Sequence, residues 1–96
     1  MGINDPRLRT MSEEVLRSFL QSALKQVKIN RLMHEGDENA VPQIMPEQWA
    51  MIVAVHAGHL TEAVLEGDDV KVERELLHVA APLLELYLVV KGGKGA

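Results

Sequence analysis

Two segments of this sequence, 46–66 and 69–90, show the apolar periodicity of helices, and each carries apolar side chains on more than one face. In the first segment, one stripe consists of Trp49, Ile52, Val53, Leu60 and Val64. Other apolar side chains lie elsewhere around it: Met51, Ala54, Val55 and Leu65. A helix that is apolar all round must be buried, and three helices of one chain cannot cover all of these faces. We therefore expect a homo-oligomer, a dimer or a tetramer, that completes a helical bundle.

A further helix is expected before these two, over residues 11–34. Its apolar side chains recur at helical intervals on one face: Leu16, Phe19, Leu20, Ala23, Leu24 and Val27. Thr10 and Glu13 have the spacing of a capping box, which places the start of the helix at about residue 11. We interpret residues 1–10 as an N-terminal arm with the composition of a disordered segment.

The helix boundaries follow from residues with special backbone preferences. Pro46 suits the first position of a helix, and Gly67 suits the residue that follows a helix end. Asp68 or Asp69 can cap the next helix. Pro82 removes one hydrogen bond from the interior of that helix, so we expect a bend there rather than an end.

The predicted fold is therefore all-α, an antiparallel bundle of three main helices over about 11–34, 46–66 and 69–90. These helices form one domain over residues 11–91, because 96 residues suffice for a single small domain. The glycine-rich end "KGGKGA" predicts a flexible tail over residues 92–96.

The composition narrows the classes of function. The chain has no cysteine, which excludes disulfides and thiolate metal sites. The net charge of −4 argues against a general binder of nucleic-acid polymers. No apolar run reaches the roughly 20 residues of a membrane span, and the start of the chain lacks the apolar core of a secretory signal. We expect a cytoplasmic protein without a membrane or nucleic-acid partner.

Two pairs of polar residues interrupt the apolar faces of the second and third helices. His56 lies within the stripe of the second helix, and His59 lies one turn away on its flank. Glu75 and His78 are likewise one turn apart on the third helix. If the two helices are antiparallel about the turn "GDD", both pairs reach similar heights and meet between apolar faces. The cluster must then be internally hydrogen-bonded or hold an ion. Paired side chains on facing helices are a common way to build metal sites in bundles.

At these residues the sequence resembles the MazG-type nucleoside triphosphate pyrophosphohydrolases, an all-α family. That family carries Glu-Glu-x-Gly-Glu-Leu-x-Glu-Ala on one helix and Glu-Leu-x-Asp-Val on the next. Here "VHAGHLTEA" keeps Gly58, Leu60, Glu62 and Ala63, and "ELLHV" keeps Glu75, Leu76 and Val79. The resemblance covers roughly residues 12 to 90. It implies a metal-assisted reaction that converts a nucleoside triphosphate to the monophosphate and pyrophosphate.

The resemblance also implies which residues form the site. The positions of the family's four catalytic, metal-binding carboxylates correspond to His56, His59, Glu75 and His78, and Glu62 would supply a further oxygen beside them. The family uses magnesium, which prefers oxygen ligands. Three imidazoles fit zinc, iron, nickel or manganese better, so we expect one of these metals or none.

Several alternatives remain open at this point. The site is either rebuilt around a transition metal or no longer catalytic, and whether the chain is an enzyme is undecided. A non-enzymatic helical protein that uses its surplus apolar faces for association is the alternative function. Nucleotide binding would use Lys25, Lys28 and Arg31 as phosphate-binding charges, whereas the simpler interpretation is a solvated helix face.

Overall fold

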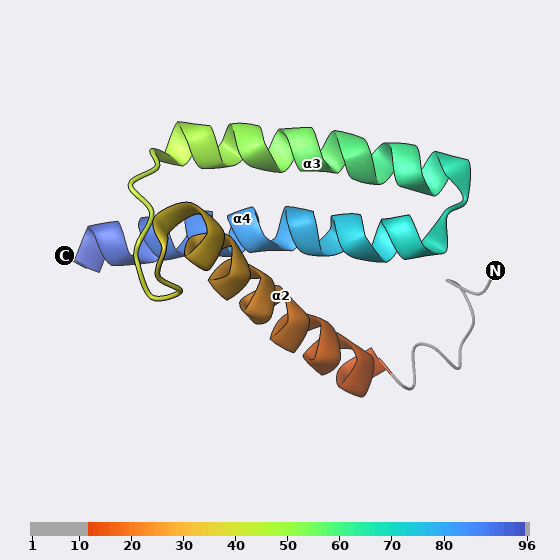
Figure 1. The fold of residues 1–96 in the computed structure, drawn as a ribbon, viewed down its shortest axis with the longest axis horizontal. Helices are drawn as coiled ribbons and strands as arrows, with labels where there is room; N and C mark the ends of the chain where they lie inside the picture. Colours follow the sequence, from red (N-terminus) through yellow and green to blue (C-terminus); the bar gives the residue numbers. More distant parts are fainter. Residues whose placement is uncertain (1–11, 96) are drawn as a thin grey trace.

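A computed structural model describes residues 12–95 of the chain, and three helices account for most of them (Figure 1). They are α2 (Ser12–Glu35), α3 (Pro46–Glu66) and α4 (Asp69–Gly95). The described residues contain no β-strand. The all-α prediction is therefore confirmed. The predicted arm over residues 1–10, and the predicted cap at Thr10, lie outside the described residues.

Helices α3 and α4 form an antiparallel hairpin with a tight turn, as the sequence predicted (Figure 1). Gly67 adopts a left-handed conformation with φ 71°, which glycine reaches without strain. Its N–H donates to the carbonyl of Val64, and the N–H of Asp68 donates to the carbonyl of Ala63. This pattern is a Schellman motif, which satisfies the last carbonyls of α3. The Asp68 carboxylate then caps α4 by accepting the N–H of Lys71 at 3.1 Å.

The other predicted boundaries hold, with one correction. Pro46 is the first residue of α3, and α4 continues through Pro82 as a single helix. The predicted end of this helix near residue 90 is wrong, because α4 extends to Gly95. Glycine costs about 1 kcal/mol in a helix relative to alanine, whereas each residue added to a formed helix gains a hydrogen bond. Glycines therefore weaken the end of α4 without stopping it.

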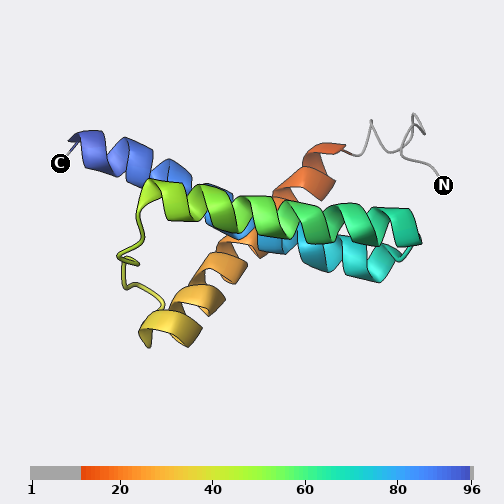
Figure 2. The same cartoon turned by 90° about the horizontal axis from the view of Figure 1, so that it is seen from above.

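Helix α2 does not run parallel to the hairpin. Figure 2 shows that it passes obliquely beneath α3 and α4. It contacts α4, with Ala23 and Val27 buried at 1% and 7% exposure. The small side chain of Ala23 lets the two helix backbones approach closely. Because α2 contacts α4 and not α3, space remains between the C-terminal half of α2 and the hairpin.

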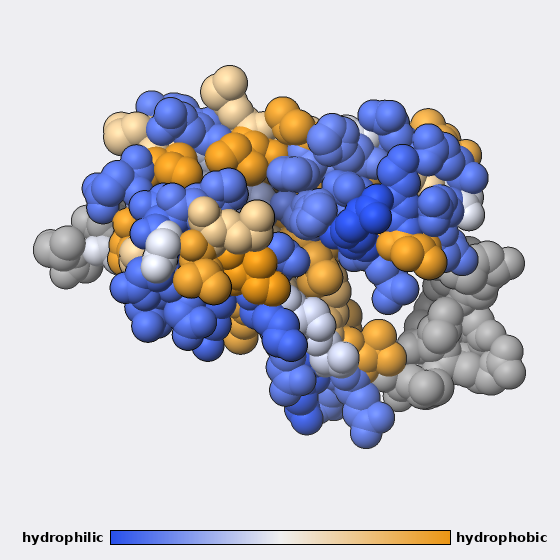
Figure 3. Space-filling model, viewed as in Figure 1, coloured by the Kyte–Doolittle hydropathy of each residue, from blue (hydrophilic) through white to orange (hydrophobic). Residues whose placement is uncertain are grey.

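The buried core of the described chain is small. Its buried apolar residues are Ala23, Val27, Trp49, Ala63 and Ala81, and no large side chain is fully buried. Many larger apolar residues are more than half exposed, including Leu16, Met51 and Leu65. On the face seen in Figure 3, hydrophobic residues lie in patches among hydrophilic ones. The surplus of apolar faces is thus present, and the oligomer inferred from it stays a prediction.

The sequence predicted no membrane-spanning segment, and the described helices can be compared with that expectation. None of them is both long and apolar enough to cross a membrane. In α4, for example, Lys71, Glu73, Arg74 and Glu75 break the apolar run in the first turns.

Candidate metal centre

The hairpin brings together four side chains that the sequence predicted to meet. His56 and His59 project from α3, and Glu75 and His78 project from α4. Within each pair the residues are three apart, so they lie one above the other on the same helix face. Antiparallel packing about the short turn brings the two pairs to the same height, which is the juxtaposition that the sequence predicted.

Glu75 is the centre of this cluster. Its Oε1 atom lies 3.5 Å from Nδ1 of His78, 3.8 Å from Nδ1 of His56 and 3.9 Å from Nδ1 of His59. These separations exceed the usual hydrogen-bond range of about 2.7–3.2 Å. Ligand atoms about 2.0–2.1 Å from a tetrahedral zinc ion are roughly 3.3–3.5 Å from one another. The spacing is thus closer to that of atoms sharing a metal ion than to direct hydrogen bonds.

Two atoms of the cluster are buried without a partner. Oε1 of Glu75 and Nδ1 of His56 make no hydrogen bond with any described residue. The Glu75 side chain is only 9% exposed, and its other oxygen, Oε2, lies 3.8 Å from Nε of Arg74. A buried carboxylate oxygen without a hydrogen bond is costly, so a proton, a water or a cation is expected to contact it.

The three histidines are not equivalent. The donor atoms of His56, Glu75 and His78 all lie within 4.8 Å of one another, so these three residues could hold one metal ion. The rings of His56 and His78 meet edge to face with centroids 5.4 Å apart. His59 is 52% exposed, compared with 31% for His56 and 33% for His78. His59 therefore lies at the rim of the cluster.

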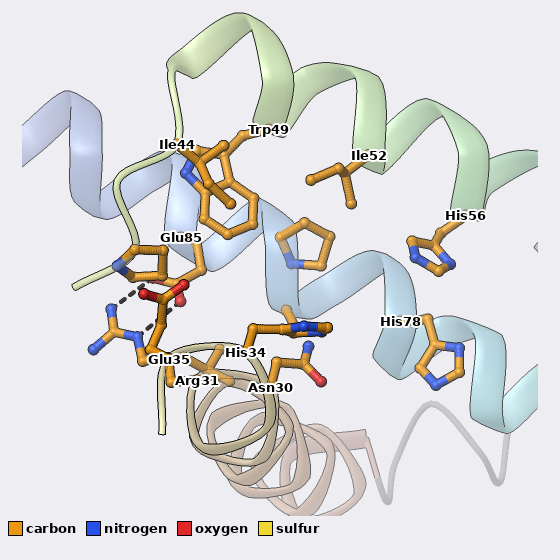
Figure 4. A pocket seen from close by; sticks show the side chains of 14 residues that line it. Asn30, Arg31, His34, Glu35, Ile44, Trp49, Ile52, His56, His78 and Glu85 are labelled. Carbon is orange, nitrogen blue, oxygen red and sulfur yellow. Dashed lines mark hydrogen bonds and ion pairs between the residues drawn. The ribbon is translucent and has the colours of Figure 1, made fainter. Parts of the chain in front are cut away.

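A pocket of about 470 Å³ adjoins the cluster, between the hairpin, the C-terminal half of α2 and the loop that follows it. Figure 4 shows His56 and His78 at one end of this pocket and Arg31 with Glu85 at the other. Trp49 and Ile52 line the wall that α3 provides. Small-molecule sites typically have volumes of about 300–1,000 Å³ and mostly apolar walls with a few polar groups, which this pocket matches.

Arg31 forms an ion pair that the sequence did not reveal. Its guanidinium donates two hydrogen bonds to the carboxylate of Glu85, at 2.8 Å and 2.6 Å (Figure 4). Both side chains are largely buried, at 14% and 6% exposure. The hydrogen bonds from Arg31 to Glu85 raise the pKa of Arg31, burial opposes this, and the charge of Glu85 adds to it. The guanidinium thus stays charged and is held by Glu85.

The other predicted site residues lie away from the cluster. Lys25 and Lys28 are exposed on α2 and do not line the pocket. Glu62 is exposed on α3, and its charge contributes to the raised pKa of Lys71. The phosphate-binding role of Lys25, Lys28 and Arg31, and the supporting role of Glu62, stay predictions.

Some residues at the pocket were not singled out from the sequence. Glu85 follows His78 by seven residues, so it lies on the same helix face within an otherwise apolar run. This acid, seven residues after His78 in an apolar run, was the sequence feature that could have identified Glu85 as a pocket residue. His34 also lines the pocket. No local pattern marks it, because the loop and the crossing of α2 bring it there.

In our comparisons, no protein-family model, curated protein or solved structure matches this chain. The resemblance to the MazG-type family stays a prediction.

Proposed function

We propose that this protein binds a divalent transition-metal ion through His56, Glu75 and His78. The observation that carries the proposal is the buried Oε1 of Glu75, which lies among three imidazole nitrogens and makes no hydrogen bond with any residue of 12–95. A metal ion would neutralise the carboxylate and give it and Nδ1 of His56 a partner. The mixed nitrogen and oxygen donors favour zinc, iron or nickel over magnesium.

The pocket leaves room for further ligands on the same ion. Three protein ligands and an open position are typical of catalytic zinc sites, whereas structural sites are closed by four. His59, 3.9 Å from the same oxygen, would fill the fourth position if its exposed ring turned inward. Comparing the metal affinity of His59→Ala with that of His56→Ala and His78→Ala therefore distinguishes an open site from a closed one.

Metal binding is measured by titrating the full chain with Zn²⁺, Co²⁺ and Mg²⁺. Trp49 is the only tryptophan and precedes His56 by two helical turns, roughly 10 Å along α3, so Co²⁺ at the site should quench its fluorescence. We expect Zn²⁺ to compete with Co²⁺, and Mg²⁺ to leave the signal unchanged. His56→Ala and His78→Ala should abolish the quenching. His34→Ala is the matched control, since His34 lines the pocket outside the cluster.

The titration gives clear outcomes. Unaltered quenching in His56→Ala would mean that the ion binds elsewhere, and no quenching in the natural protein would rule out the site. If His59→Ala weakens binding much less than His78→Ala, the site is open. An equal loss in both variants means that four residues ligate the ion.

As a second function we propose metal-assisted hydrolysis of a nucleoside triphosphate to the monophosphate and pyrophosphate, the reaction of the family that the sequence resembles. The observation in its favour is that His56 and His78 line a pocket of ligand size. A bound metal ion would activate water for attack on phosphate. The competing proposal is a helical protein that keeps the fold without catalysis.

Activity is measured as pyrophosphate release from a panel of ribo- and deoxynucleoside triphosphates, with magnesium, manganese, zinc and iron(II) supplied separately. We expect release with a transition metal, lost in Glu75→Gln and retained in Leu65→Ala, because Leu65 is 82% exposed and does not line the pocket. If metal binds but no nucleotide is hydrolysed, metal binding stands and the hydrolase proposal fails.

A further inference from the structure

The pocket beside the candidate metal centre is lined by one face of each hairpin helix. From α3 come Trp49, Ile52 and His56, and from α4 come His78, Ala81, Pro82 and Glu85. Spacings of three and four keep each set on one helix face. His56 and His78 lie at one end of the pocket, and Glu85 lies at the other end (Figure 4). Because Glu85 follows His78 by seven residues, the two ends are roughly 10 Å apart along α4.

The end beside the cluster would attract one negative charge once a divalent metal ion is bound. The ion brings two positive charges, the carboxylate of Glu75 offsets one of them, and neutral imidazoles offset none. His56 and His78 line the pocket whereas Glu75 does not, so a molecule in the pocket would reach the ion from the side of the two imidazoles. One carboxylate there would balance the remaining charge and supply a further oxygen ligand.

The opposite end has no free positive charge for a second anionic group. Arg31 is the only lysine or arginine among the described residues that line the pocket. Glu85 already accepts two hydrogen bonds from its guanidinium. Glu35 lies at the same end and adds a further negative charge (Figure 4). Because binding favours opposite charges in contact, this end suits an uncharged group.

Between the two ends the pocket has apolar walls. The side chains that line this part include Ile44, Trp49, Ile52, Ala81 and Pro82. The indole of Trp49 can stack on another aromatic ring, which gains more than the burial of apolar area alone. The volume of about 470 Å³ suits a small molecule, and the length of roughly 10 Å suits a fused pair of rings that carries an acid group.

We propose that the pocket binds an aromatic carboxylic acid with a single negative charge on a fused pair of rings. Its carboxylate would bind the ion held by His56, Glu75 and His78, and its rings would lie between Trp49 and Pro82. This inference rests on the proposed metal binding. It favours a different class of molecule from the nucleoside triphosphate of the second proposal, which carries several negative charges.

The test uses 2-naphthoate as the probe, titrated by calorimetry into the full chain loaded with Zn²⁺ and, separately, into the full chain with a chelator present. We expect saturable binding with Zn²⁺ that weakens by about tenfold or more with the chelator, because the carboxylate loses the ion. The primary amide of 2-naphthoate keeps the rings without the charge. It should bind equally weakly in both conditions.

Two further probes test the rings and the single charge. Octanoate, an aliphatic acid, should bind the Zn²⁺-loaded chain about fivefold more weakly than 2-naphthoate, because it cannot stack on Trp49. A naphthalene dicarboxylate with its second acid group at the opposite end of the rings should bind about tenfold more weakly, because that group would meet Glu35 and Glu85.

Matched variants locate the probe. Ile52→Trp fills the middle of the pocket and should abolish binding of 2-naphthoate while Zn²⁺ still binds. Leu65→Trp adds the same side chain at a position that is 82% exposed and outside the pocket, so it should leave both affinities unchanged. If Ile52→Trp does not fold, the comparison of probes on the natural protein decides the question.

The outcomes separate this inference from the proposed metal binding. Binding of Zn²⁺ without binding of 2-naphthoate overturns the inference and leaves the metal proposal in place. Equal affinity for 2-naphthoate with Zn²⁺ and with the chelator also overturns it, as does tighter binding of octanoate, the dicarboxylate or adenosine triphosphate. Absence of Zn²⁺ binding overturns both proposals.

Discussion

The α3–α4 hairpin has buried glutamates on one side and exposed leucines on the other, which is the reverse of where these residue types usually lie. On the pocket side, Glu75 and Glu85 are 7% and 5% exposed. On the opposite side, Leu76 and Leu83 are 39% and 48% exposed. Glutamates are almost never fully buried unless they are paired, and leucines are among the most often buried residues. The buried acids therefore each need a partner, whereas the oligomer expected to cover the exposed leucines stays a prediction.

The two buried acids differ from each other as well. Glu85 has its partner within the chain, because Arg31 donates two hydrogen bonds to it. Glu75 has three histidines at distances beyond the usual hydrogen-bond range, and its Oε1 lacks any hydrogen bond among the described residues. The first acid therefore serves the fold, and the second is the candidate for binding an ion.

The largest effect is expected at Glu85. Glu85→Ala leaves the buried Arg31 without its partner, and breaking such a pair typically costs about 3 kcal/mol. The free energy of unfolding, measured by urea denaturation, should fall by that amount. Glu13→Ala removes the exposed pair with Arg17 and should change it by less than about 1 kcal/mol. Equal effects in the two variants would show that burial of the Arg31–Glu85 pair is not what makes it important.

The next effect concerns Glu75 and metal affinity. Glu75→Gln removes the charge of the central ligand and should weaken Zn²⁺ binding by about a hundredfold or more, as measured by calorimetric titration. Glu62→Gln is the control, because Glu62 is exposed on the same hairpin. If Glu62→Gln weakens binding as much as Glu75→Gln does, the predicted role of Glu62 beside the ligands gains support and the triad alone is insufficient.

A smaller effect on the free energy of unfolding is expected when a leucine is truncated, and its size depends on whether another subunit covers that leucine. If the predicted homo-oligomer covers Leu76, Leu76→Ala should lower the free energy of unfolding by about 2 kcal/mol. Leu65→Ala, at a position 82% exposed on α3, should change it by less than about 0.5 kcal/mol. Both are read from urea denaturation at one protein concentration. Two equally small changes would mean that the opposite side of the hairpin stays in contact with water.

The smallest effect concerns the turn of the hairpin. The hydrogen bond to Glu66 and its charge raise the pKa of Lys71, which is exposed. A raised pKa in the folded state means that any stabilisation is present below the ordinary lysine pKa of about 10.4 and is lost as the pH rises through the folded value. The contribution is present at pH 7 but screened by solvent, so Glu66→Gln should lower stability there by no more than the error of thermal unfolding. A clear loss at pH 7 would contradict a purely solvent-screened pair.

The helices and their ends were predictable because they depend on residues close in the sequence. Apolar spacing, Gly67 at the end of α3 and Asp68 before α4 act within one or two turns. Even the meeting of His56 with Glu75 followed from two helical pairs and a short turn. The end of α4 was mispredicted, because glycines lower helix stability without fixing where a helix stops.

Local sequence patterns were therefore enough to predict the three helices, the hairpin and the apolar side chains on several faces of α3 and α4. The folded chain was needed to show that Arg31 pairs with Glu85, 54 residues away, and that α2 crosses beneath the hairpin to leave a pocket. It was also needed to show that Glu75 is the centre of the cluster, with His59 at the rim. Helix formation is governed by contacts within a few residues, which is why local patterns predict it. The crossing of α2 is set instead by close packing of side chains such as Ala23 and Val27 on α4, which no local pattern encodes.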